Sequence, residues 1–391
     1  MPAYRINPRI ENLATPPIAD VQGWIEGRQF DADKPLLDVS QAVPSYQPAE
    51  ALRKHMAEVL DHPDTSLYTG IVGTPELRGA LARHLSDDYS GQVKAEQVAI
   101  TAGCNQAFST AIDTLSQAGD EIVLPVPYYF NHQMWLEMRD LRPAFVHRRD
   151  GRLQLEDIES AINDRTRAVV LVNPDNPTGE EYTPDFIMSL FEICKLNAVA
   201  LIIDETYKDF RTEPAPPHDL FKQPAWDETF IHLFSFSKAF AVTGYRIGGM
   251  VAHADLIDSA EKLLDCATIC ASHIGQRAAL FALANLDDWK REKAALMKQR
   301  MAVLSDSFKS NELEYRLISS GAYFAYVEHP FASQNATTVA RRLADEFNVL
   351  CLPGSMFGEQ QERFLRFAFA NLEASEIPEL VRRLIASQTQ M

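Results

Sequence analysis

The sequence contains no apolar run that approaches the roughly 20 residues a membrane-spanning helix requires. Its first ten residues carry Arg5 and Arg9 with no apolar segment behind them, so no signal peptide or membrane anchor is predicted. Low-complexity segments and internal repeats are absent as well. We therefore expect a soluble cytoplasmic protein.

Positive charge is scarce, since 37 Lys and Arg stand against 54 Asp and Glu and the formal net charge is −17. Nucleic acids and anionic membranes both bind basic surfaces, so neither is expected as a partner. The five cysteines form no Cys-x-x-Cys motif, and their odd number leaves no complete disulfide framework, which indicates a reducing compartment. Cys266 and Cys270 lie one helical turn apart, but no further ligand completes the pattern, so no metal site is predicted.

The chain is nevertheless long enough for two or three domains, and its 46% hydrophobic and 23% charged content is typical of globular proteins. Residues 1–45, rich in proline and polar residues, are interpreted as an N-terminal arm that packs with a small domain. Residues 46–286 are interpreted as a large domain and residues 287–391 as a small C-terminal domain.

Short apolar runs alternate with helical segments from about residue 97. The expected strands are 98–101, 121–124, 144–147, 168–172, 199–203 and 230–234. Several are apolar throughout, which is typical of parallel strands covered by helices on both faces. The expected fold class is α/β, with a three-layer α/β/α large domain around a mostly parallel sheet. After residue 286 helices and strands follow in an order that indicates a smaller α+β domain.

The most informative stretch runs from Ser235 to Arg246 and places Lys238 just after an apolar strand. A lysine whose pKa is lowered by burial or a nearby cation can form a Schiff base with an aldehyde, and an arginine can bind a phosphate or a carboxylate with its rigid fork. Taken alone, however, such a stretch is more often an exposed turn.

Two further loops follow expected strands. Gly103, Cys104 and Asn105 open a helix, where free backbone N–H groups can bind an anion, although a tight strand-to-helix turn explains the same residues equally well. Tyr129 lies in a run of three aromatic residues, and it could stack on a flat cofactor or belong to the core.

Two more loops carry polar groups. The first, 173–179, has two Asn-Pro steps that fix its backbone, so Asn176 can present its amide to a ligand. In the second loop Asp204 leaves a buried strand and needs a cation, either a protonated ring nitrogen or a structural salt-bridge partner, and Tyr207 follows it. Together the loops fit a phosphorylated aromatic aldehyde, and pyridoxal 5′-phosphate (PLP) is such a molecule.

Three motifs carry a family resemblance. Asn176-Pro177-Thr178-Gly179, Asp204-Glu205-Thr206-Tyr207 and Ser235-Phe236-Ser237-Lys238 with Arg246 resemble the class I and II aminotransferases, PLP enzymes of fold type I similar to aspartate aminotransferase. The resemblance implies that Lys238 binds the cofactor aldehyde and moves the substrate proton, and that Asp204 pairs with the ring nitrogen. It also implies the remaining cofactor contacts: Tyr129 on the ring, Asn176 and Tyr207 at the phenolic oxygen, and Ser235 and Arg246 at the phosphate with the N–H groups of Gly103, Cys104 and Asn105.

The same resemblance assigns Arg366 to the substrate α-carboxylate and Tyr68 to the phosphate of a partner subunit, which implies a homodimer with shared sites. Two positions depart from the family pattern. Ala42 stands where a glycine usually approaches the substrate, so the substrate-binding side of the pocket would be more crowded, and Cys104 replaces an alanine or serine.

The implied activity is amino-group transfer from an L-amino acid to a 2-oxo acid by a ping-pong mechanism. A carbon–sulfur β-lyase or another elimination or cyclisation enzyme has the same cofactor motifs and stays an alternative. A non-catalytic PLP-sensing regulatory protein is disfavoured by the acidic composition and by the retention of Lys238 with Arg366. The side chain of the substrate cannot be read from these motifs.

Overall fold

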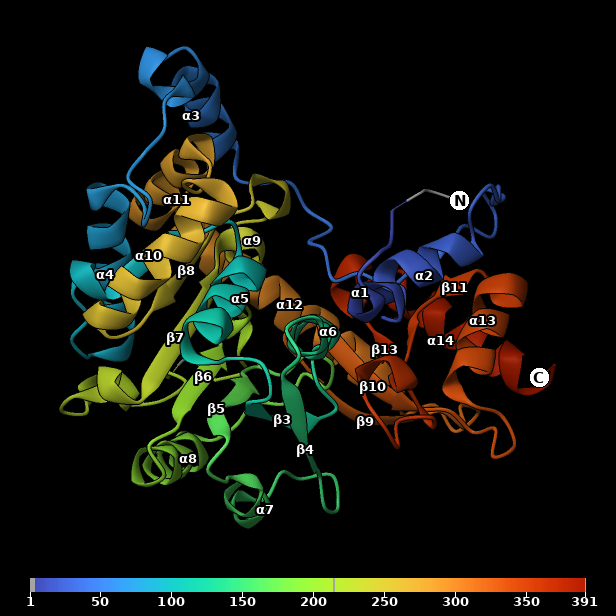
Figure 1. Cartoon of the computed structure of the whole chain (residues 1–391). Coiled ribbons are helices and arrows are strands. Elements are labelled where there is room, and N and C mark those ends of the chain that lie inside the picture. The colour runs from blue at the N-terminus through green and yellow to red at the C-terminus, as the bar shows by residue number, and fades with distance from the viewer. Residues whose placement is uncertain (1–3, 214, 391) are drawn as a thin grey trace.

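The computed structural model describes residues 4–213 and 215–390, and it contains two separate β-sheet regions (Figure 1). The larger is a seven-stranded sheet in the order β2-β8-β7-β6-β5-β3-β4. Its strands are β2 (Val98–Thr101), β3 (Glu121–Val126), β4 (Arg142–His147), β5 (Thr166–Val172), β6 (Ala200–Asp204), β7 (Phe230–Ser235) and β8 (Gly248–Val251). All described neighbours in this sheet pair in parallel except those of β8. The expected α/β fold class is therefore confirmed.

Six of these strands fall where apolar runs predicted them, whereas β8 was missed. Its sequence starts with Gly248 and Gly249, which have no side chains to signal a strand. The fold requires the first glycine, because a Cβ on Gly248 would lie 2.8 Å from the backbone carbonyl carbon of Gly103. The close approach of two backbones therefore explains why this strand lacks the apolar run that marks the other six.

Helices cover both faces of the seven-stranded sheet. Along β6, Ile202 points into one hydrophobic cluster and Leu201 and Ile203 into the other, because successive strand residues face opposite sides. The Ile202 cluster includes residues of α5 (Cys104–Leu115), α6 (Phe130–Met138) and α10 (Ala254–Thr268). The opposite cluster includes residues of α3 (Glu50–Leu60), α4 (Pro75–Tyr89), α7 (Leu155–Ala161), α8 (Pro184–Leu196) and α11 (His273–Asn285). We call this sheet with its helices the large-sheet region.

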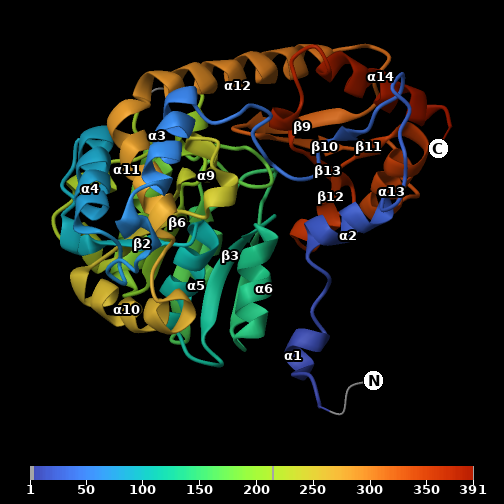
Figure 2. The same ribbon diagram turned by 90° about the horizontal axis from the view of Figure 1, so that it is seen from above.

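The small-sheet region contains the antiparallel sheet β12-β13-β10-β9 and the parallel pair β1-β11. Its strands are β1 (Leu37–Asp38), β9 (Arg316–Gly321), β10 (Phe324–Glu328), β11 (Val349–Leu350), β12 (Leu352–Pro353) and β13 (Phe364–Phe367). Its helices are α12 (Asp287–Ser307), α13 (Ala336–Phe347) and α14 (Ile377–Gln388). Figure 2 shows α12 reaching from the large-sheet region to this one. The α+β order expected after residue 286 is what the structure shows.

The N-terminal segment contacts both regions. Helix α2 (Pro17–Trp24) packs on α13 and β12, whereas α1 (Pro8–Glu11) contacts α6 and Arg9 pairs with Asp140 at 2.6 Å. The domain limits 1–45, 46–286 and 287–391 stay a prediction. Among the described helices, none combines the length and the apolar character needed to cross a membrane.

Candidate functional site

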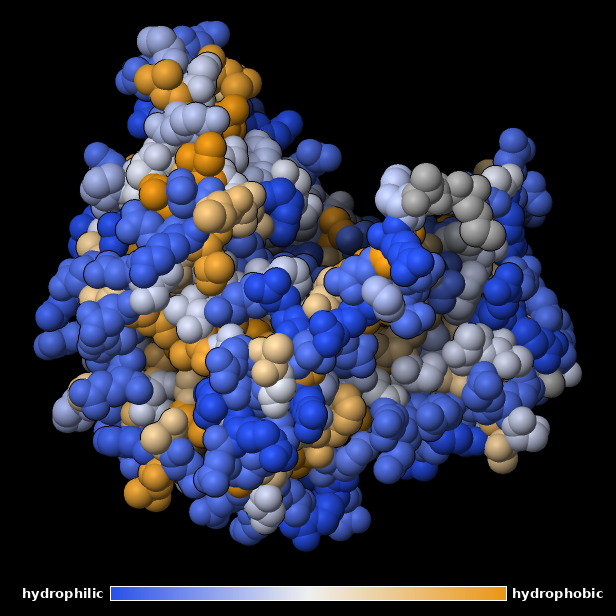
Figure 3. Space-filling model, in the orientation of Figure 1, coloured by the Kyte–Doolittle hydropathy of each residue, from blue (hydrophilic) through white to orange (hydrophobic). Residues whose placement is uncertain are grey.

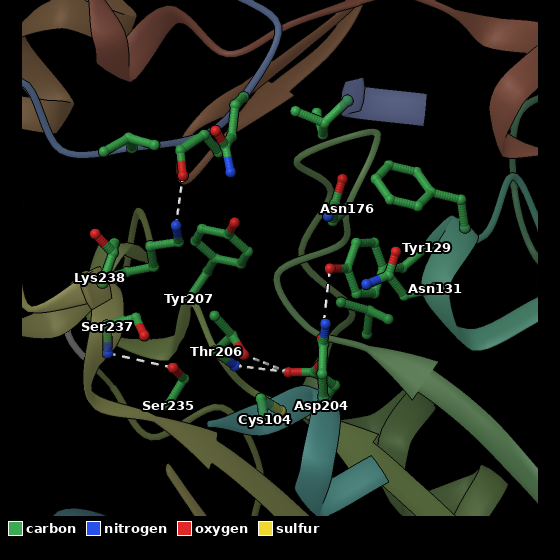
Figure 4. A pocket seen from close by; sticks show the side chains of 18 of the residues that line it. Cys104, Tyr129, Asn131, Asn176, Asp204, Thr206, Tyr207, Ser235, Ser237 and Lys238 are labelled. Atoms are coloured by element: carbon green, nitrogen blue, oxygen red, sulfur yellow. Dashed lines mark hydrogen bonds between the residues drawn. The ribbon is translucent and has the colours of Figure 1, made fainter. Parts of the chain in front are cut away.

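A cavity of about 570 Å³ lies at the carboxyl ends of three adjacent parallel strands. Val172, Asp204 and Ser235, the last residues of β5, β6 and β7, all line it, because parallel strands end at the same edge of a sheet. Most predicted site residues converge there (Figure 4). The predicted residues that line it are Ala42, Cys104, Asn105, Tyr129, Asn176, Asp204, Tyr207, Ser235, Lys238, Arg246 and Arg366.

Lys238 lies in the short helix α9 (Phe236–Ala239), which Ser235 caps by accepting a hydrogen bond from the Ser237 N–H at 3.2 Å. Its Nζ donates to the carbonyl oxygen of Ala42, and no described carboxylate forms an ion pair with it. Burial, together with the nearby cations Arg246 and Arg366, lowers the pKa of Lys238 to about 8. On the order of one tenth of the amine is therefore neutral and nucleophilic at pH 7, far more than for a lysine of ordinary pKa.

Asp204 is held as an ionised carboxylate without an arginine or lysine partner among the described residues. Its Oδ1 accepts hydrogen bonds from the Thr206 N–H at 3.0 Å and the Thr206 hydroxyl at 2.7 Å, and His132 Nε2 lies 3.6 Å from Oδ2. Burial alone would raise the pKa of Asp204, but His132 and Thr206 outweigh it and hold the pKa below its ordinary value. Burial raises the pKa of the adjacent Cys104 thiol, so that thiol stays protonated. Among the described residues no lysine or arginine forms a salt bridge with Asp204, and His132, when protonated, is the ion-pair partner that the structure gives it.

Two tyrosines stand on opposite sides of the cavity (Figure 4). The Tyr129 hydroxyl donates to Asn105 Oδ1 at 3.4 Å, and its ring packs edge-on against His132. Tyr207 packs against Phe324 with ring centroids 5.0 Å apart. Burial raises the pKa of Tyr129 to about 12 and raises that of Tyr207 further, so both are neutral hydroxyl groups.

Hydrogen-bond donors without anionic partners gather at the start of α5. The Arg246 guanidinium donates to the carbonyl oxygens of Ala102 and Thr243 at 3.2 and 3.1 Å. It lies so close that a Cβ on Gly103, whose φ is +90°, would be 2.3 Å from Arg246 Nη2. The Ser237 hydroxyl is buried without a hydrogen-bond partner in the described part of the chain. This end of the cavity can bind an anion such as a phosphate.

Arg366 provides a second cation, 2% exposed on β13. It donates to Asn176 Oδ1 at 3.1 Å and to the carbonyl oxygen of Ser40, while its Nε has no hydrogen-bond partner within the described residues. The guanidinium lies over the rings of Phe324 and Phe357, at 5.0 and 5.2 Å from their centroids. Burial lowers its pKa to about 10, yet it stays protonated at neutral pH. A buried guanidinium without a carboxylate partner is suited to bind one from a ligand.

Tyr68 lies outside this cavity. Its side chain is 76% exposed, in a loop where the Thr69 N–H lies 3.5 Å from Cys270 Sγ and the Leu67 carbonyl lies 3.3 Å from His273 Nδ1. Gly103 does not line the cavity, but its lack of a side chain leaves room for the Arg246 guanidinium. Among the described residues no group of three or more His, Cys, Asp and Glu side chains is placed to hold a metal ion.

Sequence reasoning missed several residues at the site. Thr206 and Ser237 were inside the quoted motifs but had no assigned role, and His132 follows Tyr129 at helical spacing. Pro16 and Ile18 reach the cavity from the N-terminal segment, where no motif marks them. The other residues missed in the lining are Gln41, Val43, Asn131, Val172, Thr243 and Gly244, whereas Phe130 belongs to the run of three aromatic residues noted in the sequence.

Known proteins match this chain in sequence and fold. The family model described as aminotransferase class I and II matches residues 34–384. The chain is 29% identical to the aspartate aminotransferase of Sulfolobus acidocaldarius over 87% of each chain, and 28% identical to the aromatic aminotransferase ISS1 of Arabidopsis thaliana over 89% of this chain and 88% of the relative. The structure of the aspartate aminotransferase from Rhizobium meliloti has a TM-score of 0.86 at 23% identity and covers 98% of each chain.

Proposed function

Because the chain belongs to the aminotransferase class I and II family and is a transferase of amino groups, we propose that it moves the amino group of an L-amino acid to a 2-oxo acid with PLP held on Lys238. Bound PLP would supply an electron-withdrawing ring that accepts the electron pair left when the α-proton is removed. The proposal concerns the cofactor, the residue roles and the ping-pong order of the two half-reactions.

The residues of the cavity fit this cofactor. A ring nitrogen that carries a proton requires an anion, and Asp204 is an ionised carboxylate with no lysine or arginine partner among the described residues. A phosphate requires donors, and the buried Ser237 hydroxyl is unsatisfied while Arg246 has no carboxylate within the described residues. An aldehyde requires an amine, and Lys238 is buried without an ion-pair partner there.

Lys238 has two proposed roles. Its amine carries the cofactor, and once a substrate amine replaces it, the free amine can take the proton from the substrate α-carbon. A base is most effective when its pKa lies near the working pH, and the lowered pKa of about 8 meets this condition. Asp204 would keep the ring nitrogen protonated, and Tyr207 and Asn176 would hold the phenolic oxygen.

Arg366 is proposed to bind the substrate α-carboxylate and thereby orient the α-proton toward Lys238. Both groups approach the same loop, since Lys238 donates to Ala42 and Arg366 to Ser40. Ala42 lines the same cavity, so its methyl group would restrict the space for the substrate there.

The proposal includes a homodimer in which Tyr68 reaches the phosphate of the partner subunit. Its 76% exposure supports this role, because a large side chain so exposed is available to another chain. We also propose a cytoplasmic location, which the five free cysteines support.

One observation carries the proposal: the buried Lys238 amine lies in the same cavity as Asp204 and Arg366 and forms no ion pair with a carboxylate of the described residues. The purified enzyme should be mixed with single amino acids, and conversion of the cofactor from its aldehyde to its amine form followed by absorbance. Lys238→Ala should abolish this conversion, whereas the exposed control Lys309→Ala should leave it unchanged. Retained conversion in Lys238→Ala would refute the assignment.

The lyase alternative is tested in the same samples. A carbon–sulfur β-lyase releases ammonia and a 2-oxo acid and leaves the cofactor as the aldehyde. Release of ammonia without the amine form of the cofactor would therefore replace amino-group transfer by elimination.

A further inference from the structure

We infer that the amino acid used by this enzyme carries an uncharged, apolar side chain and not a second carboxylate. This inference rests on the proposed amino-group transfer at the same site and specifies its substrate class.

Each positively charged side chain of the cavity already has a proposed partner. Three cations are found among the described residues that line it, namely Lys238, Arg246 and Arg366. Arg246 lies at the start of α5 with the phosphate donors, Lys238 binds the cofactor, and Arg366 binds the α-carboxylate. No lysine or arginine of the described lining is left to pair with a carboxylate on the substrate side chain.

The wall beside Arg366 is apolar. Arg366 lies 5.2 Å from the ring centroid of Phe357, and Phe357 packs against Phe130 with ring centroids 5.6 Å apart. Phe130 lines the cavity, and Ile18 packs against the same hydrophobic cluster and lines it too. A substrate whose carboxylate lies on Arg366 therefore has Phe130 and Ile18 within reach of its side chain.

The polar groups near this wall are neutral. Asn131 and Gln41, the chain neighbours of Phe130 and Ala42, also line the cavity, and both are amides. An amide can accept or donate a hydrogen bond but cannot neutralise a carboxylate. A charged side chain would lose its water there without an ionic partner, which is costly, whereas an apolar side chain would gain by burial.

The chain segments around Tyr68 are poor in basic residues as well. The segments 62–74 and 266–276, joined by the contact between Thr69 and Cys270, contain no lysine or arginine. Their exposed residues include Leu67 at 62% and Ile269 at 40%. Apolar residues gather over α3 and α11 on this side of the molecule (Figure 3). If this surface meets the site of a second subunit, these segments add apolar contacts and, apart from the imidazoles of His62 and His273, no basic side chain.

The first experiment measures binding to the PLP-loaded wild-type enzyme without turnover. Titration with 3-phenylpropionate and with succinate, followed by the visible absorption of the cofactor, compares an apolar with a carboxylate end on one scaffold. We expect 3-phenylpropionate to bind on the order of 10- to 100-fold more tightly, because an unpaired buried carboxylate is penalised by that much. Equal binding, or tighter binding of succinate, would overturn the inference.

The same enzyme is then assayed for kcat/KM with phenylalanine, methionine, leucine, aspartate and glutamate. The first three should be preferred. Preference for aspartate or glutamate would contradict the inference and leave the proposed amino transfer intact, whereas absence of cofactor conversion with every amino acid would contradict the proposed function itself.

A charge introduced at the wall provides the matched test. Ile18→Lys should raise succinate affinity and kcat/KM for aspartate by roughly tenfold while lowering both for the apolar ligands. Ile18→Met has a similar length and no charge, so it should keep the wild-type preference. An Ile18→Lys protein that folds but keeps the wild-type preference would show that this wall does not contact the side chain; should it fail to fold, the wild-type titration still decides.

Discussion

The guanidinium of Arg366 donates a hydrogen bond to Asn176 Oδ1 at 3.1 Å, and this bond connects β13 of the small-sheet region with the loop after β5 of the large-sheet region. Both residues line the cavity, and 190 positions separate them in the sequence. Arg366, which is proposed to bind the substrate carboxylate, is thus positioned by the Asn176 amide, which belongs to the proposed cofactor site.

Replacing Arg366 by leucine should weaken substrate binding and leave the cofactor in place. A hydrogen-bonded charge pair contributes about 1.5–3 kcal/mol, so KM should rise roughly 10- to 100-fold. Arg366→Lys keeps the charge but loses the bidentate geometry of the guanidinium, so its KM should lie between those of Arg366→Leu and the wild type. Steady-state kinetics, together with the cofactor absorbance of each variant, measure the two effects; unchanged KM in Arg366→Leu would remove this residue from the substrate site.

The lowered pKa of Lys238 predicts a pH-dependent reactivity in the cofactor-free protein. Competitive acetylation read by mass spectrometry should show the Lys238 amine becoming reactive with a midpoint near pH 8, below the value of ~10.4 for a lysine in a model peptide. Removal of a neighbouring cation by Arg366→Leu should move the Lys238 midpoint upward. A Lys238 midpoint near the model-peptide value of ~10.4 in the wild type would contradict this account.

The same shift has a consequence for stability. Between pH 8 and 10.5 the unfolded chain keeps a proton on this lysine that the folded chain has lost, so the free energy of unfolding rises with pH in that window. Lys238→Met should therefore be more stable than the cofactor-free wild type below pH 8, and the difference should shrink toward pH 10.5. Thermal unfolding of both proteins across this range measures the effect, and a difference that grows with pH would have the wrong sign.

The hydroxyl of Thr206 is predicted to position Asp204. Thr206→Val removes the 2.7 Å hydrogen bond to Asp204 Oδ1 and keeps the side-chain shape, whereas Thr206→Ser keeps the hydroxyl. We expect Thr206→Val to raise the pKa of Asp204 and to weaken PLP binding by about tenfold, consistent with the loss of a hydrogen bond to a charged group. The dissociation constant of PLP measures this, and serine should restore it; equal weakening by both variants would indicate packing instead.

Tyr68 should affect cofactor retention in a partner subunit. Tyr68→Ala and Tyr68→Phe should both increase PLP dissociation, by roughly tenfold for the loss of one hydrogen bond to a phosphate. Tyr4 is similarly exposed at 75%, so Tyr4→Ala is a matched control. Analytical ultracentrifugation checks that the oligomeric state is kept. Unchanged dissociation in dimeric Tyr68→Ala would remove Tyr68 from the shared site.

The sequence predicted the central sheet because buried parallel strands leave a local signal. The apolar run 199–203 locates β6 within one residue, and Asp204 stands out as a carboxylate at its end. The strand β8 left no such signal, because Gly248 lies against the backbone of Gly103 and Gly249 lies against the side chain of Leu81. Helix α4 also followed local rules, since the Thr74 hydroxyl accepts the Leu77 N–H at 3.3 Å as its N-cap.

The different surroundings of Asp204 and Glu205 could not be predicted from the local sequence. They are adjacent carboxylates, yet Asp204 faces the cavity, while Glu205 is fully buried in the opposite direction, with His232 Nε2 2.9 Å from its Oε2 and Tyr89 donating to it. Their difference arises from the side on which each lies and from partners brought by distant elements.

The sequence by itself determined the elements and the chemical groups: a lysine after a buried strand, a carboxylate and an amide at strand ends, and two arginines. These features can be recognised as sequence motifs because each depends on a few consecutive residues. The tertiary structure alone decided how the groups meet, since Arg366 with Asn176, and His132 with Asp204, become neighbours only through packing. It also decided the apolar wall of Ile18 and Phe130, because hydrophobic contact between distant segments is non-directional and leaves no spacing to read.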